Sequence, residues 1–431
     1  MIMAKLQRFG IRIRQLHTII SQETIKPSSP TPPHLKTHNL SLLDQFVGHI
    51  HMPIVFFYPN YNHDNTHILK KSLSHSLTQY YPFAGRFPAP HAPHINCNDQ
   101  GIVFLEASNN GRLDEFIFRK EHDETLDQLI PNGLGCTVHK TSPNLIEVQL
   151  NHFVGGGAAL AVSISHKLAD AITMANFFNH WATVTRGGSP INPSFVSSSV
   201  TNAEILGFPL MDTQKMNYVR RRFVFPNSKL YELKKKVNAM GTSPMNPSRV
   251  ELLTSLLFKC AVGAATKKSG SLMASNLFHT VNMRNRNIEK FPEMAAGNLS
   301  TTVIAKIGSD SGEIELNEVI GMLRKGIIEV EKLSDVEEVI GNLVSKLSTL
   351  GGEQSRAYIS SSMCRFRFYE MDFGWGKPVD IMFRIPEVND NCVLLMDAQS
   401  GDGIEALVRL QEEEMDIFRK DKELLAYVED I

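Results

Sequence analysis

One histidine is the strongest candidate for chemistry in this chain because of the boundary at which it lies. The stretch 162–178 begins with alternating apolar residues, which predict a strand, and continues with helical apolar spacing. His166 lies at the junction, where a strand end is a rigid support for a base and helix-entry amides supply a local positive field. Asp170 follows four positions later, so on a helix beginning near His166 the two side chains would share a face.

The spacing between His166 and Asp170 is only weak evidence of a function by itself. A His-x-x-x-Asp pattern arises by chance in many chains, and a lone histidine is usually structural. The two residues could equally be a satisfied core pair. A metal pair is disfavoured, because no third ligand occurs at a useful spacing. Chemistry at this pair therefore needs support from elsewhere in the chain.

Length and composition describe a globular protein without an obvious polyanionic partner. A chain of 431 residues is too long for one ordinary core and suggests two domains. Its 42% apolar and 21% charged residues are typical of soluble proteins. The net charge of −1 gives no electrostatic case for binding nucleic acid or an anionic membrane. No uninterrupted apolar stretch is long enough to predict a membrane span.

The cysteines favour a reducing compartment. They are odd in number and scattered, and none has CxxC spacing, so neither a disulfide framework nor a zinc cluster is favoured. We expect buried thiols in a cytoplasmic protein. The first twenty residues are basic and contain no acid, as in an organelle transit segment, although a ragged extension explains them equally simply. The five cysteines are Cys97, Cys136, Cys260, Cys364 and Cys392.

The chain divides into two αβ-rich halves. Residues 189–213 are rich in Pro, Ser, Asn and Gly without steady periodicity, which predicts a linker between a first domain, 1–188, and a second, 214–431. In the first half we expect helices at 67–80 and from His166 to about Thr185, and strands at 54–58, 102–106, 146–153 and 159–165. In the second half we expect strands at 222–225, 280–286, 300–306, 379–383, 393–396 and 404–408, and helices at 228–240, 249–264, 313–350 with a break near Gly341, and through Phe418.

A helix start near residue 248 is a candidate anion site. Ser248 and Glu251 form a capping box, which predicts that the helix begins here. The first turn of a helix presents free amides to an anion, and Arg249 adds charge. Ser248 and Arg249 are therefore candidates for binding an anion, although most capping boxes do no more than start a helix.

Three motifs together resemble one enzyme family. Tyr-Pro-Phe-Ala-Gly-Arg at 81–86, His166 with Asp170, and Asp-Phe-Gly-Trp-Gly at 372–376 occur in the order of the plant BAHD acyltransferases. The resemblance extends over nearly the whole chain from Ile25. Segments 25–32, 165–170 and 400–406 are most similar to the alkaloid acetyltransferases of that family. The segment 295–299 reads Ala-Ala-Gly-Asn-Leu where flavonoid acyltransferases carry Tyr-Phe-Gly-Asn-Cys, which argues against an anthocyanin malonyltransferase.

The resemblance implies a fold and a reaction. The fold would be α/β, a two-domain chloramphenicol acetyltransferase-like structure of mixed sheets flanked by helices, with a channel between the domains. Coenzyme A would enter the channel from one face and the acceptor from the other, and Ser248 and Arg249 are our candidates for the coenzyme phosphates. His166 would take the proton of an acceptor hydroxyl as its oxygen attacks the acyl-CoA thioester, directly and without an acyl-enzyme. Acetyl-CoA is the expected co-substrate, with no permanent cofactor or metal, and a monomer is the expected state.

The resemblance also suggests roles for two acids. Asp170 either orients the imidazole, as the acid of a catalytic triad does, or turns away to pair with Arg284, and we favour the pairing. Asp372 is important for activity in the family, yet we expect it to organise a loop near the coenzyme entrance. Gly374 and Gly376 would permit a sharp turn there.

Two departures from the family pattern bear on function. Ala171 stands where a glycine often follows the aspartate, a change that a helix tolerates easily. Met363 stands where many relatives have a tryptophan whose N–H can donate to the developing oxyanion, so Ser361 or a backbone amide would have to donate instead. We therefore expect an O-acyltransferase that acetylates a hydroxyl of a plant alkaloid or similar bulky specialised metabolite. The alternatives are a catalytically silent small-molecule-binding protein, or an acyltransferase with another acyl donor or an amine acceptor.

Overall fold

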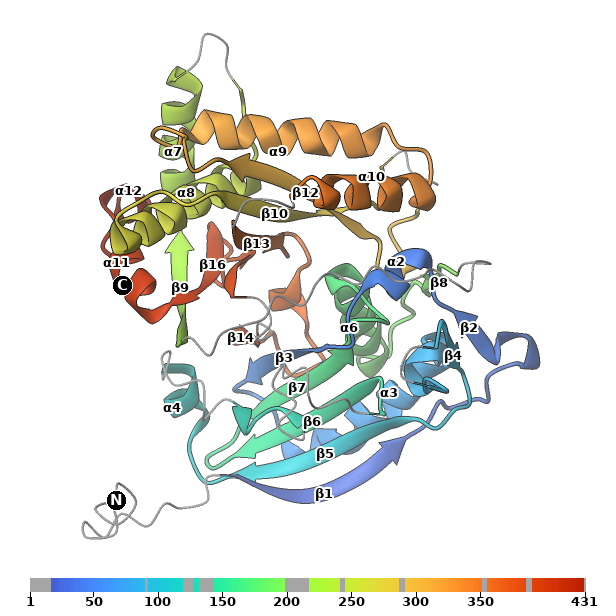
Figure 1. Cartoon of the computed structure of the whole chain (residues 1–431). Helices are drawn as coiled ribbons and strands as arrows, with labels where there is room; N and C mark the ends of the chain where they lie inside the picture. Colours follow the sequence, from blue (N-terminus) through green and yellow to red (C-terminus); the bar gives the residue numbers. More distant parts are fainter. Residues whose placement is uncertain are drawn as a thin grey trace, which may run out of the picture.

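The computed structural model contains two six-stranded sheets, one above the other in Figure 1, each accompanied by helices. The described residues are 17–89, 92–118, 127–131, 143–197, 217–240, 245–286, 291–350, 355–384 and 390–429. The predicted N-terminal extension therefore lies outside the described residues up to residue 16, as do residues 198–213 of the predicted linker.

The first sheet is built mainly by the first half of the chain. Its only parallel pair is β5 with β6, and every other described neighbouring pair is antiparallel. Helices α3 (Thr66–Gln79) and α6 (Ala171–Thr185) pack against each other beside it. In order across the sheet the strands are β1 (His17–Ile25), β5 (Ile102–Asn109), β6 (Ile146–Phe153), β7 (Ala158–Ser165), β3 (His51–Tyr58) and β14 (Asp380–Phe383).

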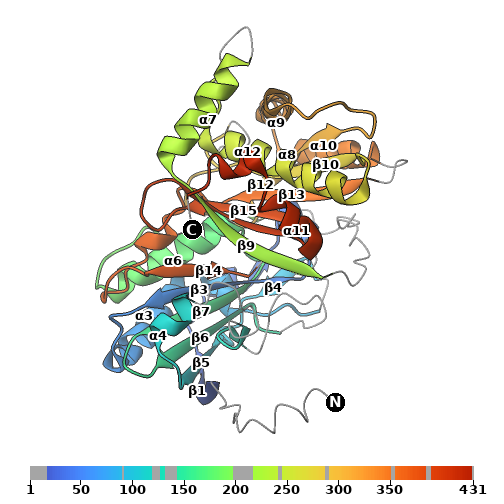
Figure 2. The ribbon, with the colours of Figure 1, turned by 90° about the vertical axis from the view of Figure 1, so that its left-hand side faces the viewer.

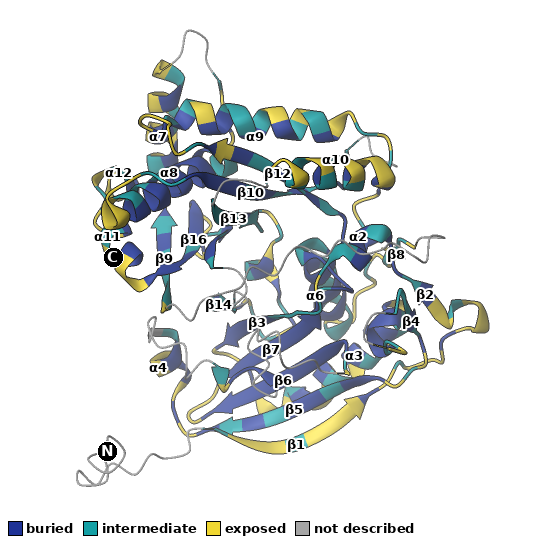
Figure 3. Ribbon diagram, in the orientation of Figure 1, coloured by how far each residue is buried: buried dark blue, intermediate teal, exposed yellow. Residues whose placement is uncertain are grey.

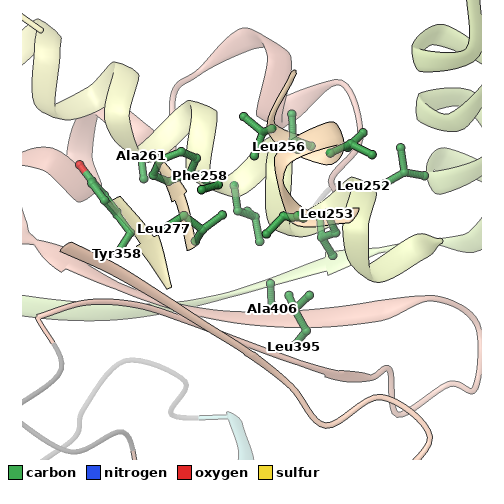
Figure 4. Close-up of a cluster of buried hydrophobic side chains, with 14 of the residues drawn as sticks. Leu252, Leu253, Leu256, Phe258, Ala261, Leu277, Tyr358, Leu395 and Ala406 are labelled. Carbon is green, nitrogen blue, oxygen red and sulfur yellow. The ribbon is translucent and has the colours of Figure 1, made fainter. Parts of the chain in front are cut away.

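The second sheet is built by the second half of the chain around helix α8 (Arg249–Ser269). Figure 4 shows apolar side chains of α8, among them Leu253 and Leu256, facing residues of four strands of this sheet. Both leucines are fully buried, which identifies the α8 contact as the centre of the second core. In order the strands are β12 (Ser300–Ile307), β10 (Ser275–Asn282), β13 (Arg356–Ser362), β15 (Asn391–Asp397), β16 (Ile404–Gln411) and β9 (Tyr218–Phe225).

The remaining elements are short or lie on the outside. Helices α9 (Leu316–Glu331) and α10 (Val336–Ser348) alternate buried and exposed residues, as expected of an outer layer (Figure 3). The other helices are α2 (Leu42–Phe46), α4 (Leu113–Phe118), α7 (Asn227–Ala239), α11 (Glu412–Phe418) and α12 (Lys422–Leu425). The other strands form two small pairs, β2 (Thr37–Asn39) with β4 (His94–Asn96) and β8 (Ser194–Phe195) with β11 (Ala295–Ala296).

The two halves exchange elements across their boundary. Strand β14 comes late in the chain but pairs with β3 of the first sheet, with Asp380 opposite Phe57, and Figure 2 shows it between the two sheets. Arg222 of β9 donates to the Asp380 carboxylate at 2.7 Å. In the opposite direction, Leu43 of α2 packs in the core of the second half. Residues from both halves can therefore meet at one site.

Most predicted elements are present, with three informative differences. The predicted 313–350 helix breaks between α9 and α10 rather than near Gly341, because the Asp335 carboxylate accepts from the Glu338 amide at 2.9 Å and starts a new helix. The predicted 280–286 strand ends at Asn282, which leaves Arg284 in the following turn. Strand β1 was not predicted, because it is an exposed edge strand without a buried apolar face.

The cysteines and the helices agree with the expectations from sequence where the structure describes them. Cys97, Cys260 and Cys392 are buried free thiols and Cys364 is a partly buried one, whereas Cys136 lies outside the described residues. Within the described part of the chain, no helix combines the length and apolarity that crossing a bilayer requires.

Candidate active site

The backbone of His166 is fixed at the end of a buried strand. Strand β7 ends at Ser165, which lies opposite His51 of β3, and the His166 amide donates to the Ile50 carbonyl at 2.8 Å. His166 is partly exposed, although residues 158–165 and 167–170 around it are all buried. The residue therefore lies at a rigid strand end and is not wholly enclosed by the chain around it.

Asp170 does not share a helix face with His166, so that expectation was wrong. Residues 166–168 form a turn, and α6 begins only at Ala171. Asp170 is the N-cap of α6, and its Oδ1 accepts from the Thr173 amide at 2.9 Å. An aspartate satisfies the free amides of a helix start better from this position than from inside the first turn.

Asp170 pairs instead with Arg284, as the preferred alternative predicted. Nη1 of Arg284 donates to Oδ2 of Asp170 at 2.7 Å, and Nη2 donates to Oδ1 at 3.0 Å. Both side chains are buried, with exposed fractions of 9% for Asp170 and 2% for Arg284. The Leu299 amide also donates to Asp170 at 3.0 Å, and Arg284 donates to the Ala295 and Gly297 carbonyls. This two-bond ion pair joins the first half of the chain to the second.

The partner of the His166 ring is Asn298, which lies two residues before β12. Nδ1 of His166 lies 3.1 Å from Oδ1 of Asn298. The Asn298 amide nitrogen donates to the His166 carbonyl at 2.7 Å and to Oδ1 of Asp44 at 2.9 Å. Both of those oxygens accept, so the network assigns the amide oxygen of Asn298 to the ring. Nδ1 of His166 must then carry the proton, which leaves the lone pair of Nε2 available.

Asp44 of α2 supports Asn298 from behind. Its Oδ1 also accepts from the Asn298 backbone amide at 2.6 Å, and its Oδ2 accepts from the Ser41 amide and hydroxyl at 2.9 and 2.6 Å. Burial raises the pKa of Asp44 to about 6, although the hydrogen bonds from Ser41 and Asn298 oppose the rise. The ring, the amide and the carboxyl group thus form one connected chain of hydrogen bonds.

The surroundings keep the His166 imidazole neutral near pH 7. Burial lowers its pKa, and this outweighs the opposing effects of its own backbone carbonyl, the Asp170 charge and the bond to Asn298. A neutral imidazole with one nitrogen held as a donor and the other unprotonated can accept a proton from a hydroxyl. The arrangement is similar to a catalytic triad, except that an amide, in place of the acid, orients the imidazole through Nδ1.

Sequence reasoning did not identify Asn298 or Asp44 as functional. Asn298 belongs to the Gly-Asn pair at 297–298, which is shared with the corresponding element of flavonoid acyltransferases, and that pair was the available signal. Asp44 and Ser41 form a capping box for α2, and this pattern indicates only a helix start. The two residues come together with His166 only through the fold.

Asp372 organises the loop in which it lies. Its Oδ1 accepts from the amides of Gly374 and Gly376 at 2.7 and 3.0 Å. Both glycines have positive φ, +109° and +99°, which other residues adopt only under strain. Phe373 of this loop is buried and packs edge to face on Trp181 of α6. The hydrogen bonds found for its carboxylate stay within the loop and do not reach His166.

Ser248 and Arg249 lie at the start of α8, as predicted. The capping box is present: the Ser248 hydroxyl accepts from the Glu251 amide at 3.2 Å, and the Glu251 carboxylate accepts from the Ser248 amide at 2.7 Å. Arg324 pairs with Glu251 at 2.6 Å, and Arg249 donates to the Asn227 side chain at 2.7 Å. The Ser248 hydroxyl and amide are therefore engaged in the cap, whereas the Arg249 side chain is outside it and bonds to Asn227.

Comparison with known proteins identifies the family. The Transferase family matches residues 17–425, nearly the whole described chain. The chain belongs to the BAHD acyltransferase family. Epi-neemfruitin B synthase of Melia azedarach is 36% identical over 95% of this chain and 97% of its own length. Stemmadenine O-acetyltransferase of Catharanthus roseus is 34% identical over 94% of this chain and 96% of its own.

A solved structure supports the same assignment. The crystal structure of vinorine synthase, an enzyme of Rauvolfia serpentina, covers 96% of this chain and 98% of its own with a TM-score of 0.80 and 30% identity. The predicted family, the chloramphenicol acetyltransferase-like α/β fold and the enzyme class are therefore confirmed. This BAHD protein is an acyltransferase.

Proposed function

We propose that this BAHD acyltransferase transfers an acetyl group from acetyl-CoA to a hydroxyl group of a bulky apolar specialised metabolite such as a plant alkaloid. The main observation that supports this proposal is the hydrogen bond between Nδ1 of His166 and Asn298, which leaves Nε2 as an acceptor. The name of stemmadenine O-acetyltransferase, a relative over nearly the full length, supports an acetyl donor and an oxygen acceptor.

The proposed reaction is a direct transfer with His166 as general base. Nε2 takes the proton of the acceptor hydroxyl while the oxygen attacks the thioester carbonyl. The tetrahedral intermediate collapses as the C–S bond breaks, and the imidazolium returns the proton to the departing thiolate. A base positioned in this way contributes roughly 10² to 10⁴ in rate. The Asp170 carboxylate is occupied by Arg284, so it does not act on the imidazole directly. Asp170 instead holds in place the turn that carries His166.

An acyl-cysteine intermediate has little support from the four cysteines that the structure describes. Burial raises the pKa of Cys97 and Cys392 to about 12 and that of Cys364 to about 11. Burial also raises the pKa of Cys260. Thiols of this kind carry almost no thiolate near neutral pH, and the thiolate is the nucleophile. A ternary complex of enzyme, acyl-CoA and alcohol is therefore the better account.

We assign the oxyanion donor at the end of β13 to Ser361. The Met363 side chain has no donor, and the Met363 amide already donates to the Leu395 carbonyl at 2.7 Å. The Cys364 amide donates to the Ser362 hydroxyl at 3.3 Å. Of the candidates raised by the missing tryptophan, the hydroxyl of partly buried Ser361 then best fits the role.

The coenzyme is proposed to approach from the side of the second half. Arg249, on the first turn of α8, is the candidate for a coenzyme phosphate, with Ser248 holding the helix start in place. Asp372 would act at a distance from the acyl carbon by keeping its glycine loop folded near the coenzyme entrance.

A product assay tests this function. The purified full chain is incubated with acetyl-CoA and a panel of alkaloid alcohols, and products are detected by mass spectrometry. The proposal expects an O-acetyl ester from at least one alcohol, and no acetylated protein when acetyl-CoA is added without acceptor. Coenzyme binding without turnover across the panel would favour a catalytically silent binding protein. Products formed only with malonyl-CoA, or only on amines, would overturn the proposed donor or acceptor.

A further inference from the structure

A second cluster of ligand-type side chains lies on the first sheet, apart from His166. Glu106 of β5, His152 of β6 and His63, which precedes α3, each place one ligand atom within 4.8 Å of the other two. The three residues come from three separate elements, so no local sequence pattern brings them together. Two imidazoles with one carboxylate are a ligand set that suits zinc and similar transition metals.

The spacing of His152 and Glu106 already suits a shared ion. Nε2 of His152 lies 3.1 Å from Oε2 of Glu106. Two ligands of a tetrahedral zinc ion, each about 2.1 Å from the metal, lie about 3.4 Å apart. An ion can therefore replace the proton between these two atoms with a small adjustment. The proton on the ring need not leave the protein, because it can move to Nδ1.

His152 is an anomalous core histidine. Its side chain is 5% exposed, and its Nδ1 has no hydrogen-bond partner among the described residues. Its one ring hydrogen bond found among the described residues joins Nε2 to Glu106, so Nε2 is the nitrogen that an ion shared with Glu106 would bind.

His63 and His67 can complete the set from the exposed side. The His63 ring stacks on His152 with centroids 3.5 Å apart, and because it is exposed it can rotate to point a nitrogen at the ion. His67 follows with His-x-x-x-His spacing, which recurs in zinc sites. Nδ1 of His67 donates to the Asp64 carbonyl at 2.7 Å, which leaves its Nε2 unprotonated.

The surroundings are open and, taken together, negative. His63, His67 and Glu106 line a cavity of about 600 Å³ with Glu23 and Asp64. Lys70, which also lines it, binds both Glu23 and Oε1 of Glu106, at 2.5 and 2.7 Å, whereas Oε2 of Glu106 faces His152. The three carboxylates outnumber this single lysine, so the local field favours a cation even with the lysine in place.

We propose that His63, His67, Glu106 and His152 bind a divalent transition-metal ion of the zinc type. The ion would tie the start of α3 to the β5–β6 pair. It would also lie next to the loop of Asp372, because the Tyr61 ring packs on both His152 and Trp375, with centroids 5.9 and 4.9 Å away. The site is independent of the proposed acyl transfer, since none of its ligands contacts His166.

Calorimetric titration of the full chain, freed of metal, with zinc chloride tests the site. We expect one tight site per chain and a rise in melting temperature with zinc. His63→Gln and Glu106→Gln should each weaken binding roughly tenfold or more and abolish the rise. His34→Gln, at an exposed histidine outside the cluster, is the control and should bind as the unchanged chain does.

Two outcomes would overturn the proposal. One is the absence of stoichiometric zinc binding by the unchanged chain. The other is binding of equal affinity in His63→Gln, which would assign the ion to other histidines. Because His63 is exposed, its variant is expected to fold, so lost binding can be separated from lost structure by circular dichroism. Cobalt(II) provides a second readout, since tetrahedral nitrogen and oxygen coordination gives it strong visible absorption, which should disappear in the same variants.

Discussion

Nδ1 of His166 lies 3.1 Å from Oδ1 of Asn298, a residue 132 positions later in the chain. The histidine ends a strand of the first sheet and the asparagine precedes a strand of the second, so the proposed base is completed only when the two halves come together. Because the same amide also donates to Asp44, it has a single orientation that fits, and the tautomer of the ring follows from it. The account rests on this relationship.

Removing the Asn298 amide should impair catalysis more than binding. In Asn298→Ala the ring loses the acceptor that holds its proton on Nδ1, so a fraction of the enzyme carries the unproductive tautomer. We expect kcat to fall roughly 10- to 100-fold with little change in KM for acetyl-CoA. Initial rates at saturating acceptor measure this, and Asn98→Ala, at an exposed asparagine, is the control. An unchanged kcat would mean that the amide does not set the tautomer.

The ion pair between Asp170 and Arg284 should contribute to the stability of the fold. Each of Asp170→Ala and Arg284→Ala leaves a buried charge unpaired, which should lower the free energy of unfolding by about 3–5 kcal/mol. The double variant should lose clearly less than the sum, since it strands no charge. Urea denaturation measures all three. Arg286→Ala, which breaks the more exposed pair with Glu331, should cost about 1 kcal/mol or less. Additive losses at Asp170 and Arg284 would contradict the pairing.

Asp44 should make stability depend on pH in a specific window. Its folded pKa, about 6, is raised above the ordinary value of 3.8, so its contribution to stability is greatest below pH 4 and is lost as the pH rises through 6. The full loss is on the order of 3 kcal/mol. Between pH 4 and 6 the unchanged chain should therefore lose stability relative to Asp44→Asn, which does not titrate. If the free energies of unfolding of the two proteins change with pH in the same way across this range, Asp44 keeps an ordinary pKa.

The carboxylate of Asp372 should matter as an acceptor rather than as a charge. Asp372→Ala removes the oxygen that holds the amides of Gly374 and Gly376, so the loop should loosen and activity should fall. Asp372→Asn keeps an oxygen in that position and should retain most of the activity. Steady-state rates and melting temperatures of the two variants measure this. If the asparagine variant is as inactive as the alanine variant, the negative charge itself is required.

Local patterns predicted most of this molecule and missed what depends on long-range contact. The periodicity of Leu69, Leu73 and Leu77 indicated α3, and the same reasoning placed His166 at a strand end. The pairing of Asp170 with Arg284 was predicted from the resemblance to the family. The spacing of the two residues in the sequence does not by itself indicate that they are in contact. The only local signals were the Gly-Asn pair for Asn298 and a capping box for Asp44, and neither reveals a role that arises where two distant segments meet in the folded chain.

Two errors had local causes that were visible in the sequence. The outer helix was expected to break near Gly341, yet glycine within a helix costs only about 1 kcal/mol, and the cap at Asp335 is the stronger signal. Asp170 was expected inside a helix, although an aspartate just before an apolar helical run is more often its N-cap. In both cases the capping residue, rather than the apolar period, determined where the helix begins.

The most direct measurement of the central claim compares the acyl-transfer rate of the unchanged chain with that of His166→Ala at saturating acetyl-CoA and acceptor, with coenzyme binding measured separately by calorimetry. The account predicts a loss of at least roughly 10² in kcat with a coenzyme Kd within about twofold of the unchanged chain. Retention of kcat within about tenfold in a variant that still binds coenzyme would show that His166 is not the base.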